Sequence, residues 1–399
     1  MPTPLPDDDH VLLTRPDLVE STFNARGIAS AAAGAGGLTE IQSLLLEALM
    51  EAMTDHHIDI AALEPISAAE FAAGMAPRNL AFRTRGVQLM LLLAMTLRPL
   101  PEEVVDRITD FAHELSVDDG MIPVARRFAS GSLGLAAVDF ARNGYTATWQ
   151  PADAASLHTS VEIREAWDSA VNDPALAARW DALEDLPADS LGRLVWQLYH
   201  ARGFEFPGRP GSAPPLLSQH DWVHVLADYG TTVEAELEVF AFIARANDDM
   251  RAFSLLAMVV SLFETGYLRS GAGLFESDLG HLSGGPGVAT RLADAMRRGA
   301  WCSDTVTGSD SIDFLRIDWF ALAPLPVDEV RDRFSLRPKS DAAIEAGSAG
   351  PRQPGGISPF QLRAGVAAAQ ARGEEYDAYG ATDADGHDGR DLDARTEPS

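Results

Sequence analysis

The sequence has one cysteine, few basic residues and no long apolar run. Because Cys302 is alone, an internal disulfide is excluded, a reducing compartment is expected, and the thiol is expected to be a small buried apolar group. The longest apolar stretch, VQLMLLLAMTL at 87–97, is too short to span a bilayer, which takes about 20 residues. The first ten residues, MPTPLPDDDH, are unlike a signal peptide. These features predict a soluble, cytoplasmic protein.

Basic side chains number 31 against 59 acidic ones, for a formal charge of −28. Such a field repels nucleic acid and anionic headgroups unless a basic face is concentrated locally. The pairs Arg126-Arg127 and Arg297-Arg298 are isolated and are expected at solvated helix ends. Nucleic acid is therefore excluded as a partner, and contact with a membrane is left open only at its periphery.

Helical periodicity recurs through the chain and no segment alternates like a strand, so the predicted fold class is all-α. A length of 399 residues with 46% apolar side chains favours two cores. We expect an N-terminal extension at 1–34, a helical bundle at 35–145, a second helical domain at 153–338 and a disordered acidic tail at 339–399.

The tail is rich in Gly, Asp, Ala and Pro, which bury little surface. Within it, Ser358 and Pro359 favour the start of a short helix at 358–373.

The first half contains an almost wholly apolar segment, RGVQLMLLLAMTLRPL, followed by PEEVVDRITDFAHEL. This order resembles the TerB-like helical domains over residues 35–145. Metal sites of that family use acidic residues near the turns, whereas the turn here reads LRPLP, so no ligands are assigned to this half. The adjacent His56 and His57 are expected on a surface loop without a metal.

The stretch QHDWVHVLADYGTTVEAE at 219–236 predicts two short helices joined by a turn. On a helical wheel, His220, Asp221 and His224 share one face. Two imidazoles at positions i and i+4 suit a single metal ion. The opposite face is expected to pack in the core and carries Trp222, Val225, Leu226 and Tyr229.

Gly230 is expected to end the first helix in the left-handed region, and Thr231 with Glu234 forms a capping-box pattern for the second.

The second helix carries three glutamates, of which one is predicted to face the core. Its apolar stripe is formed by Val233, Leu237, Phe240 and Ile243. Glu236 falls inside this stripe, whereas Glu234 and Glu238 fall outside it. A carboxylate in a helical core is costly unless a cation compensates it. The sequence therefore predicts a metal site formed by His220, Asp221, His224 and Glu236.

The same residues carry a family pattern. His220-Asp221-x-x-His224, eleven residues and then Glu236 resembles the HDxxH-x11-E motif of the ubiquinone (coenzyme Q) biosynthesis protein four family, and the similarity extends over about 155–338. The resemblance implies an all-α fold, a zinc-type metal at the four positions and quinone head-group maturation on prenylated aromatic rings. It also implies either ring decarboxylation with hydroxylation at the same carbon, or a scaffold for a biosynthetic complex.

The motif and its resemblance favour two functions and disfavour a third. The first is a metal-dependent enzyme that decarboxylates or hydroxylates a prenylated aromatic ring; His, Asp and Glu ligands suit zinc, and also iron or manganese. The second is a non-catalytic prenyl-lipid-binding scaffold that organises other biosynthetic enzymes. A metalloprotease is disfavoured because Asp221 stands where zincins place a glutamate.

A substrate pocket is predicted beside the metal site. The segment RAFSLLAMVVSLFETGYL is strongly apolar, and methionine and phenylalanine suit an adaptable wall for a prenyl chain. Leu256, Val259 and Phe263 are the residues assigned to this wall. The alternative is that they form plain core.

Overall fold

The computed structural model describes residues 16–130, 172–210, 212–213, 217–247, 252–265, 280–285, 287–383 and 385–386. Within these ranges every regular element is a helix, and pairing between extended segments is limited to isolated bridges. The all-α prediction is confirmed. The boundary between the two predicted domains, at 145–153, lies outside the described residues. Among the described helices, none is both long enough and apolar enough to cross a membrane.

The first helical layer is built around one buried helix, α4. Its elements are α1 Leu18–Ala32, α2 Glu40–Thr54, the 3-10 helix Ile60–Ala62, α3 Ala68–Met75, α4 Leu80–Ala94, α5 Glu102–Glu114 and α6 Met121–Ala129. α4 packs against α1, α2, α5 and α6 and is buried on nearly all sides, as its apolar sequence predicts. Thr39 caps α2 through a capping box with Gln42.

Helix α1 belongs to this bundle, so the expectation that residues 1–34 form a separate extension is wrong for 18–32. α1 packs against α3, α4 and α5. Small residues allow the close approach: a Cβ at Gly27 would lie 2.3 Å from the Phe71 ring, and one at Gly74 would lie 2.3 Å from the Phe23 ring. Many of the residues that α1 buries are glycine or alanine. The sequence of α1 therefore shows only a weak periodic pattern of large apolar side chains.

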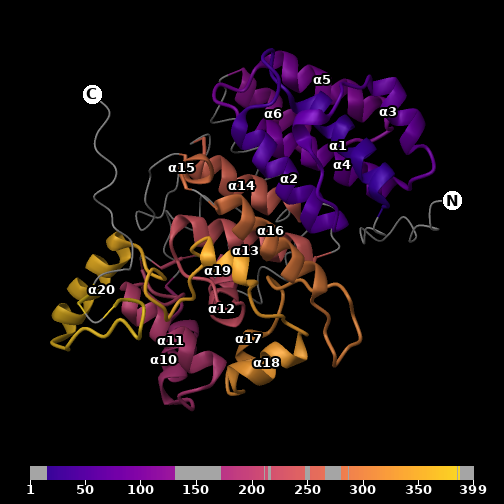
Figure 1. Ribbon diagram of the computed structural model, residues 1–399. Coiled ribbons are helices and arrows are strands. Elements are labelled where there is room, and N and C mark those ends of the chain that lie inside the picture. The colour runs from indigo at the N-terminus through magenta and orange to yellow at the C-terminus, as the bar shows by residue number, and fades with distance from the viewer. Residues whose placement is uncertain are drawn as a thin grey trace, which may run out of the picture.

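The second helical layer is centred on α13 (Figure 1). Its elements are α10 Pro174–Asp181, the 3-10 helix Ala182–Asp185, α11 Leu191–Arg202, α12 Gln219–Leu226, α13 Val233–Ala246, α14 Phe253–Phe263, α15 His281–Gly284, α16 Val288–Trp301, α17 Trp319–Leu322 and α18 Val327–Arg333. α13 contacts α12, α14, α15 and α16, and its residues are buried on almost every side. Polar groups on α13 must therefore find partners inside the protein.

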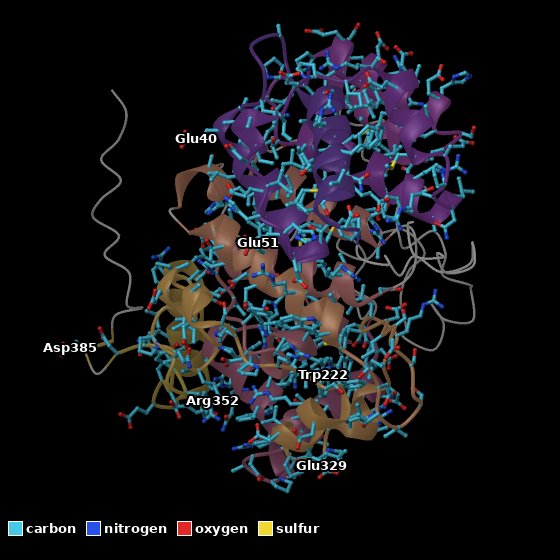
Figure 2. All side chains as sticks on the ribbon, turned by 45° about the vertical axis from the view of Figure 1, so that its right-hand side comes forward. Glu40, Glu51, Trp222, Glu329, Arg352 and Asp385 are labelled. Carbon is cyan, nitrogen blue, oxygen red and sulfur yellow. The ribbon has the colours of Figure 1, made fainter. Side chains whose placement is uncertain are left out.

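The two layers pack directly on each other. α2 lies against α16 and α4 against α14, and Figure 2 shows Glu51 where the layers meet. Glu51 pairs with Arg297 at 2.5 Å, and the Arg85 guanidinium lies 4.0 Å from the centre of the Phe253 ring. Arg298 is buried and donates hydrogen bonds to the Ala227 and Arg337 carbonyls. The expectation that the Arg297-Arg298 pair is solvated is therefore wrong for Arg298.

The C-terminal segment is packed on the second layer, so the predicted disorder is wrong for residues 339–383. It contains α19 Asp341–Glu345 and α20 Pro359–Arg372, and α20 packs on α11. Ser358 caps α20 and Pro359 occupies its first turn, as predicted. The contact is made by backbone at close range: a Cβ at Gly365 would lie 2.0 Å from the Ala201 carbonyl oxygen. A prediction based on apolar side chains misses packing of this kind, because the contact is made by backbone atoms.

We predict that deleting residues 339–399 lowers the melting temperature by about 5 °C or more. The deletion removes two of the acceptors of the buried Arg202 guanidinium, the Pro351 and Gly356 carbonyls, and a buried charge that loses hydrogen-bond partners is costly. Thermal unfolding followed by circular dichroism measures the effect. The shorter deletion of 387–399 is the control, because it leaves every described contact in place. An unchanged melting temperature after the longer deletion would contradict the prediction.

Candidate metal centre

The two helices predicted from residues 219–236 bring four polar side chains together in the interior. His220, Asp221 and His224 lie on α12, and Glu236 lies in the first turn of α13. Their exposed fractions are 4%, 7%, 0% and 5%, so water does not solvate them freely. We call His220, Asp221, His224 and Glu236 the His–carboxylate cluster.

The distances within the cluster are those of groups around one centre. Glu236 Oε2 lies 3.3 Å from His220 Nε2, and Glu236 Oε1 lies 3.3 Å from His224 Nε2. His220 Nε2 is 3.5 Å from Asp221 Oδ1, and the donor atoms of His220, Asp221 and His224 all lie within 4.8 Å of one another. Donor atoms about 2.0–2.2 Å from a tetrahedral ion are about 3.3–3.6 Å apart. The three donors of α12 are therefore close enough to bind a single ion, and Glu236 approaches each imidazole through a different oxygen.

The protons of both imidazoles are placed by backbone carbonyls. His220 Nδ1 contacts the Leu217 carbonyl oxygen, and His224 Nδ1 lies 2.7 Å from the Gly230 oxygen and 3.3 Å from the Tyr229 oxygen. A carbonyl only accepts, so each Nδ1 donates, and in the neutral ring Nε2 then carries the lone pair. Both lone pairs face Glu236. Apart from Glu236 Oε1, the buried His224 Nε2 has no polar partner among the described residues, as expected of a nitrogen that would bind a metal ion.

The charges of the cluster favour a cation at this point. Burial opposes protonation of His220, but the Asp221 and Glu236 carboxylates outweigh it and raise the pKa of His220 to about 9. Burial alone would raise the pKa of Glu236, whereas His224 and His220 hold it well below its usual range. A proton on His220 therefore compensates the buried carboxylate when no metal is bound, and a divalent ion would offer the same compensation.

Asp221 is held by a neutral donor from α11. The Tyr199 hydroxyl donates to Asp221 Oδ2 at 2.5 Å. Burial and the neighbouring Asp221 charge raise the pKa of Tyr199 well above its ordinary value, so the phenol keeps its proton and remains a donor. This residue was missed in the sequence. It lies 22 positions from Asp221 on another helix, and no local pattern indicates it.

The turn between α12 and α13 differs from its prediction. Asp228, with φ 61°, is the left-handed residue, whereas Gly230 is not. Thr232, and not Thr231, caps α13 by accepting from the Ala235 N–H at 3.4 Å. Thr231 is occupied elsewhere, by Arg202 on α11 and by Gln361 on α20. Long-range partners decided which threonine caps the helix.

Glu234 and Glu238 are buried as well, which corrects their predicted position outside the apolar stripe. Glu234 Oε1 lies 3.3 Å from His281 Nδ1, and Glu238 pairs with Arg291 at 2.5 Å. The helical wheel described one buried face, but α15 and α16 cover the other face of α13. The opposite face of α12 was placed correctly, since Trp222, Val225, Leu226 and Tyr229 are all buried.

The residues assigned to a pocket lie in the interior on α14, which packs against α13. Leu256, Val259 and Phe263 are exposed by 0%, 1% and 4%, and the Phe263 ring lies 6.3 Å from the His281 ring. These positions suit either a closed apolar wall or plain core, so the pocket stays a prediction. Cys302 is buried, and burial raises the pKa of its thiol to about 12, which fits an unreactive core thiol.

The fold and the cluster define an all-helical protein with two histidines and two carboxylates buried at one point. Comparisons with protein-family models, with curated proteins and with solved structures found no match.

We predict that Tyr199→Phe weakens zinc binding about 10- to 100-fold while leaving the stoichiometry unchanged, the usual range for groups that orient metal ligands. The substitution leaves Asp221 Oδ2 without its donor and frees the carboxylate to rotate. Competition with a chromophoric chelator measures the affinity. Tyr229→Phe is a matched control, because the Tyr229 hydroxyl is also buried but bonds to no member of the cluster. Equal affinities in the two variants would contradict the role given to Tyr199.

Zinc binding should release about one proton at pH 7, since a ligand imidazole must be neutral. The pKa of His220 in the metal-free protein is about 9, above its ordinary value, so the ring is protonated at pH 7 and loses that proton to the ion. Affinity therefore falls as the pH is lowered below 9. Titration calorimetry in buffers of different ionisation enthalpy counts the protons. No release at pH 7 would contradict the prediction.

Proposed function

We propose that this chain is a metal-dependent protein of quinone head-group biosynthesis, related in function to the ubiquinone biosynthesis protein four family. One observation carries the proposal: two imidazole Nε2 atoms, each with its Nδ1 held by a carbonyl, face the same buried carboxylate at 3.3 Å. The residue spacing of the HDxxH-x11-E motif supports it independently. The ion is zinc, with iron or manganese as alternatives for the same donors.

His220, His224, Asp221 and Glu236 would hold the ion. When bound, it would act as a Lewis acid on an oxygen of the substrate. The chain contributes the orientation of the ligands: carbonyls fix both rings, and Tyr199 fixes Asp221. The low exposure of all four side chains strengthens electrostatic interactions at this point, because little water screens them.

The proposed substrate is a prenylated aromatic acid. Its ring carboxylate would leave as carbon dioxide and a hydroxyl group would take its place, a change that requires an oxidant such as dioxygen. The apolar helix α14 beside α13 is the surface we assign to the prenyl chain, with Leu256, Val259 and Phe263 as its wall. Other biosynthetic enzymes are the proposed protein partners.

A second candidate is a scaffold that binds a prenyl lipid without turnover. The burial of the whole cluster, with His224 exposed by 0%, favours this reading, because structural metal sites are closed whereas catalytic sites keep an open position. Azide binding to the cobalt-substituted protein separates the two candidates: an ion with an open position would bind the anion and change its visible absorption, whereas an enclosed ion would keep its spectrum.

Metal analysis of the purified protein tests the site itself. Wild type should contain about one metal ion per chain, the capacity of one four-donor site, and Glu236→Gln should contain much less, since the amide removes the charge that the ion compensates. Glu234→Gln is the matched control: it lies two positions away, is also buried, and pairs with His281. Wild type without metal, or equal metal in both variants, would refute the proposed site.

Binding of a prenylated hydroxybenzoate tests the substrate class. Leu256→Trp and Val259→Trp should each weaken binding at least about 10-fold, because an indole fills the space assigned to the prenyl chain and a methylene-scale change alone gives about that factor. Fluorescence or calorimetric titration measures it. Val105→Trp introduces the same side chain at a buried position of α5 and should bind as wild type. Binding unaffected by either α14 variant, in folded protein, would leave these residues as plain core.

A further inference from the structure

The C-terminal segment meets the candidate metal centre at the turn between α12 and α13. The Gly230 N–H donates to the Ala349 carbonyl at 2.8 Å, and the Thr231 N–H donates to the Gly356 carbonyl at 2.9 Å. A Cβ at Gly230 would lie 2.7 Å from Gly356 Cα, so the two backbones are in direct contact. We call residues 348–361 the C-terminal strap.

The two peptide groups bound by the strap are the ones that hold His224. The Thr231 N–H and the Gly230 carbonyl belong to one peptide plane, and that carbonyl accepts from His224 Nδ1 at 2.7 Å. The Gly230 N–H and the Tyr229 carbonyl belong to the preceding plane, and that carbonyl lies 3.3 Å from the same nitrogen. Each plane is therefore fixed by the strap on its N–H side and orients the imidazole on its carbonyl side.

A buried arginine connects the strap, the turn and α11. Arg202, exposed by 1%, donates through Nη2 to the Pro351 carbonyl at 3.0 Å and the Gly356 carbonyl at 2.8 Å. Its Nε donates to Thr231 Oγ1 at 2.5 Å, and this hydroxyl donates to Gln361 Oε1 at 2.6 Å. Hydrogen bonds in such a chain polarise one another in a low-dielectric interior. Several hydrogen bonds together therefore fix the orientation of both peptide planes.

We infer that the C-terminal strap is a working part of the metal centre: it positions His224 through the Tyr229–Gly230 and Gly230–Thr231 peptide planes and thereby sets the affinity for the ion. The inference rests on the proposed metal site and adds to it a segment that lies more than a hundred residues beyond the HDxxH-x11-E pattern. Carbonyls that orient a ligand imidazole also raise its basicity, and their loss typically weakens metal binding about 10- to 100-fold.

The experiment compares two glycine substitutions in the full chain. Gly230→Ala places a methyl group against Gly356 and separates the strap from the turn. Gly365→Ala strains the same C-terminal segment at its contact with α11, where the Cβ would lie 2.0 Å from the Ala201 carbonyl oxygen, and none of its nearest atoms belongs to the turn. Zinc affinity is measured by chelator competition, and the visible absorption of the cobalt-substituted protein reports ligand geometry. Thermal unfolding measures the stability of each variant.

We expect Gly230→Ala to lose about 10- to 100-fold in zinc affinity and to change the cobalt spectrum, while Gly365→Ala loses stability and keeps the wild-type affinity and spectrum. Thr231→Val, which removes one hydroxyl and keeps every peptide hydrogen bond, is the milder variant and should shift the affinity in the same direction.

Three outcomes would overturn the inference. Wild type that binds no metal refutes the metal site and the inference together. Wild-type affinity and an unchanged cobalt spectrum in both Gly230→Ala and Thr231→Val refute the inference and leave the metal site standing. Equal losses of affinity in Gly230→Ala and Gly365→Ala show that the segment acts only through general stability.

Discussion

The Glu236 carboxylate lies inside a helical core and needs a cation beside it. A buried charge without a partner costs several kcal/mol, and Glu236 is exposed by only 5%. The two imidazoles of α12 meet this need, and they face Glu236 because backbone carbonyls hold their Nδ1 atoms. This arrangement requires α12 to lie close to α13 and the turn between them to hold His224. The Tyr199 hydroxyl in turn holds Asp221 at the same point.

Helix α13 extends this constraint to its neighbours. It carries three buried glutamates, and each faces a different element: Glu234 faces His281 on α15, Glu236 faces α12, and Glu238 faces Arg291 on α16. A rotation or shift of α13 would leave three carboxylates without partners. Because buried ion pairs are costly to break one side at a time, these contacts fix the orientation of α13, and α16 in turn carries the contact with the first helical layer.

The C-terminal segment shows a kind of packing that composition does not reveal. Its contacts with the second layer are made by glycines and backbone carbonyls: Gly230 meets Gly356, and a Cβ at Gly203 would lie 2.6 Å from the Ala364 carbonyl oxygen. The acceptors that this segment offers to Arg202, on Pro351 and Gly356, are likewise carbonyls. Composition alone predicts disorder for a segment with few large apolar residues. This segment nevertheless packs, because it supplies hydrogen-bond acceptors to the buried Arg202 guanidinium and its small residues permit close approach.

The sequence by itself determined what depends on neighbours along the chain. Helical period placed His220, His224 and Glu236 on inward faces. The apolar composition of α4 indicated its burial, and local side-chain chemistry identified the cap Ser358. Tertiary structure alone decided the rest. Thr232 rather than Thr231 caps α13, because the Thr231 hydroxyl is hydrogen-bonded to Arg202 and Gln361. Glu238 can be buried because Arg291, which is 53 positions away in the sequence, pairs with it in the folded chain. α1 and the C-terminal segment dock through glycines, whose role depends on the surface they meet. Periodicity carries information about one helix, whereas a buried polar group is set by partners on several helices, and only the folded chain brings them together.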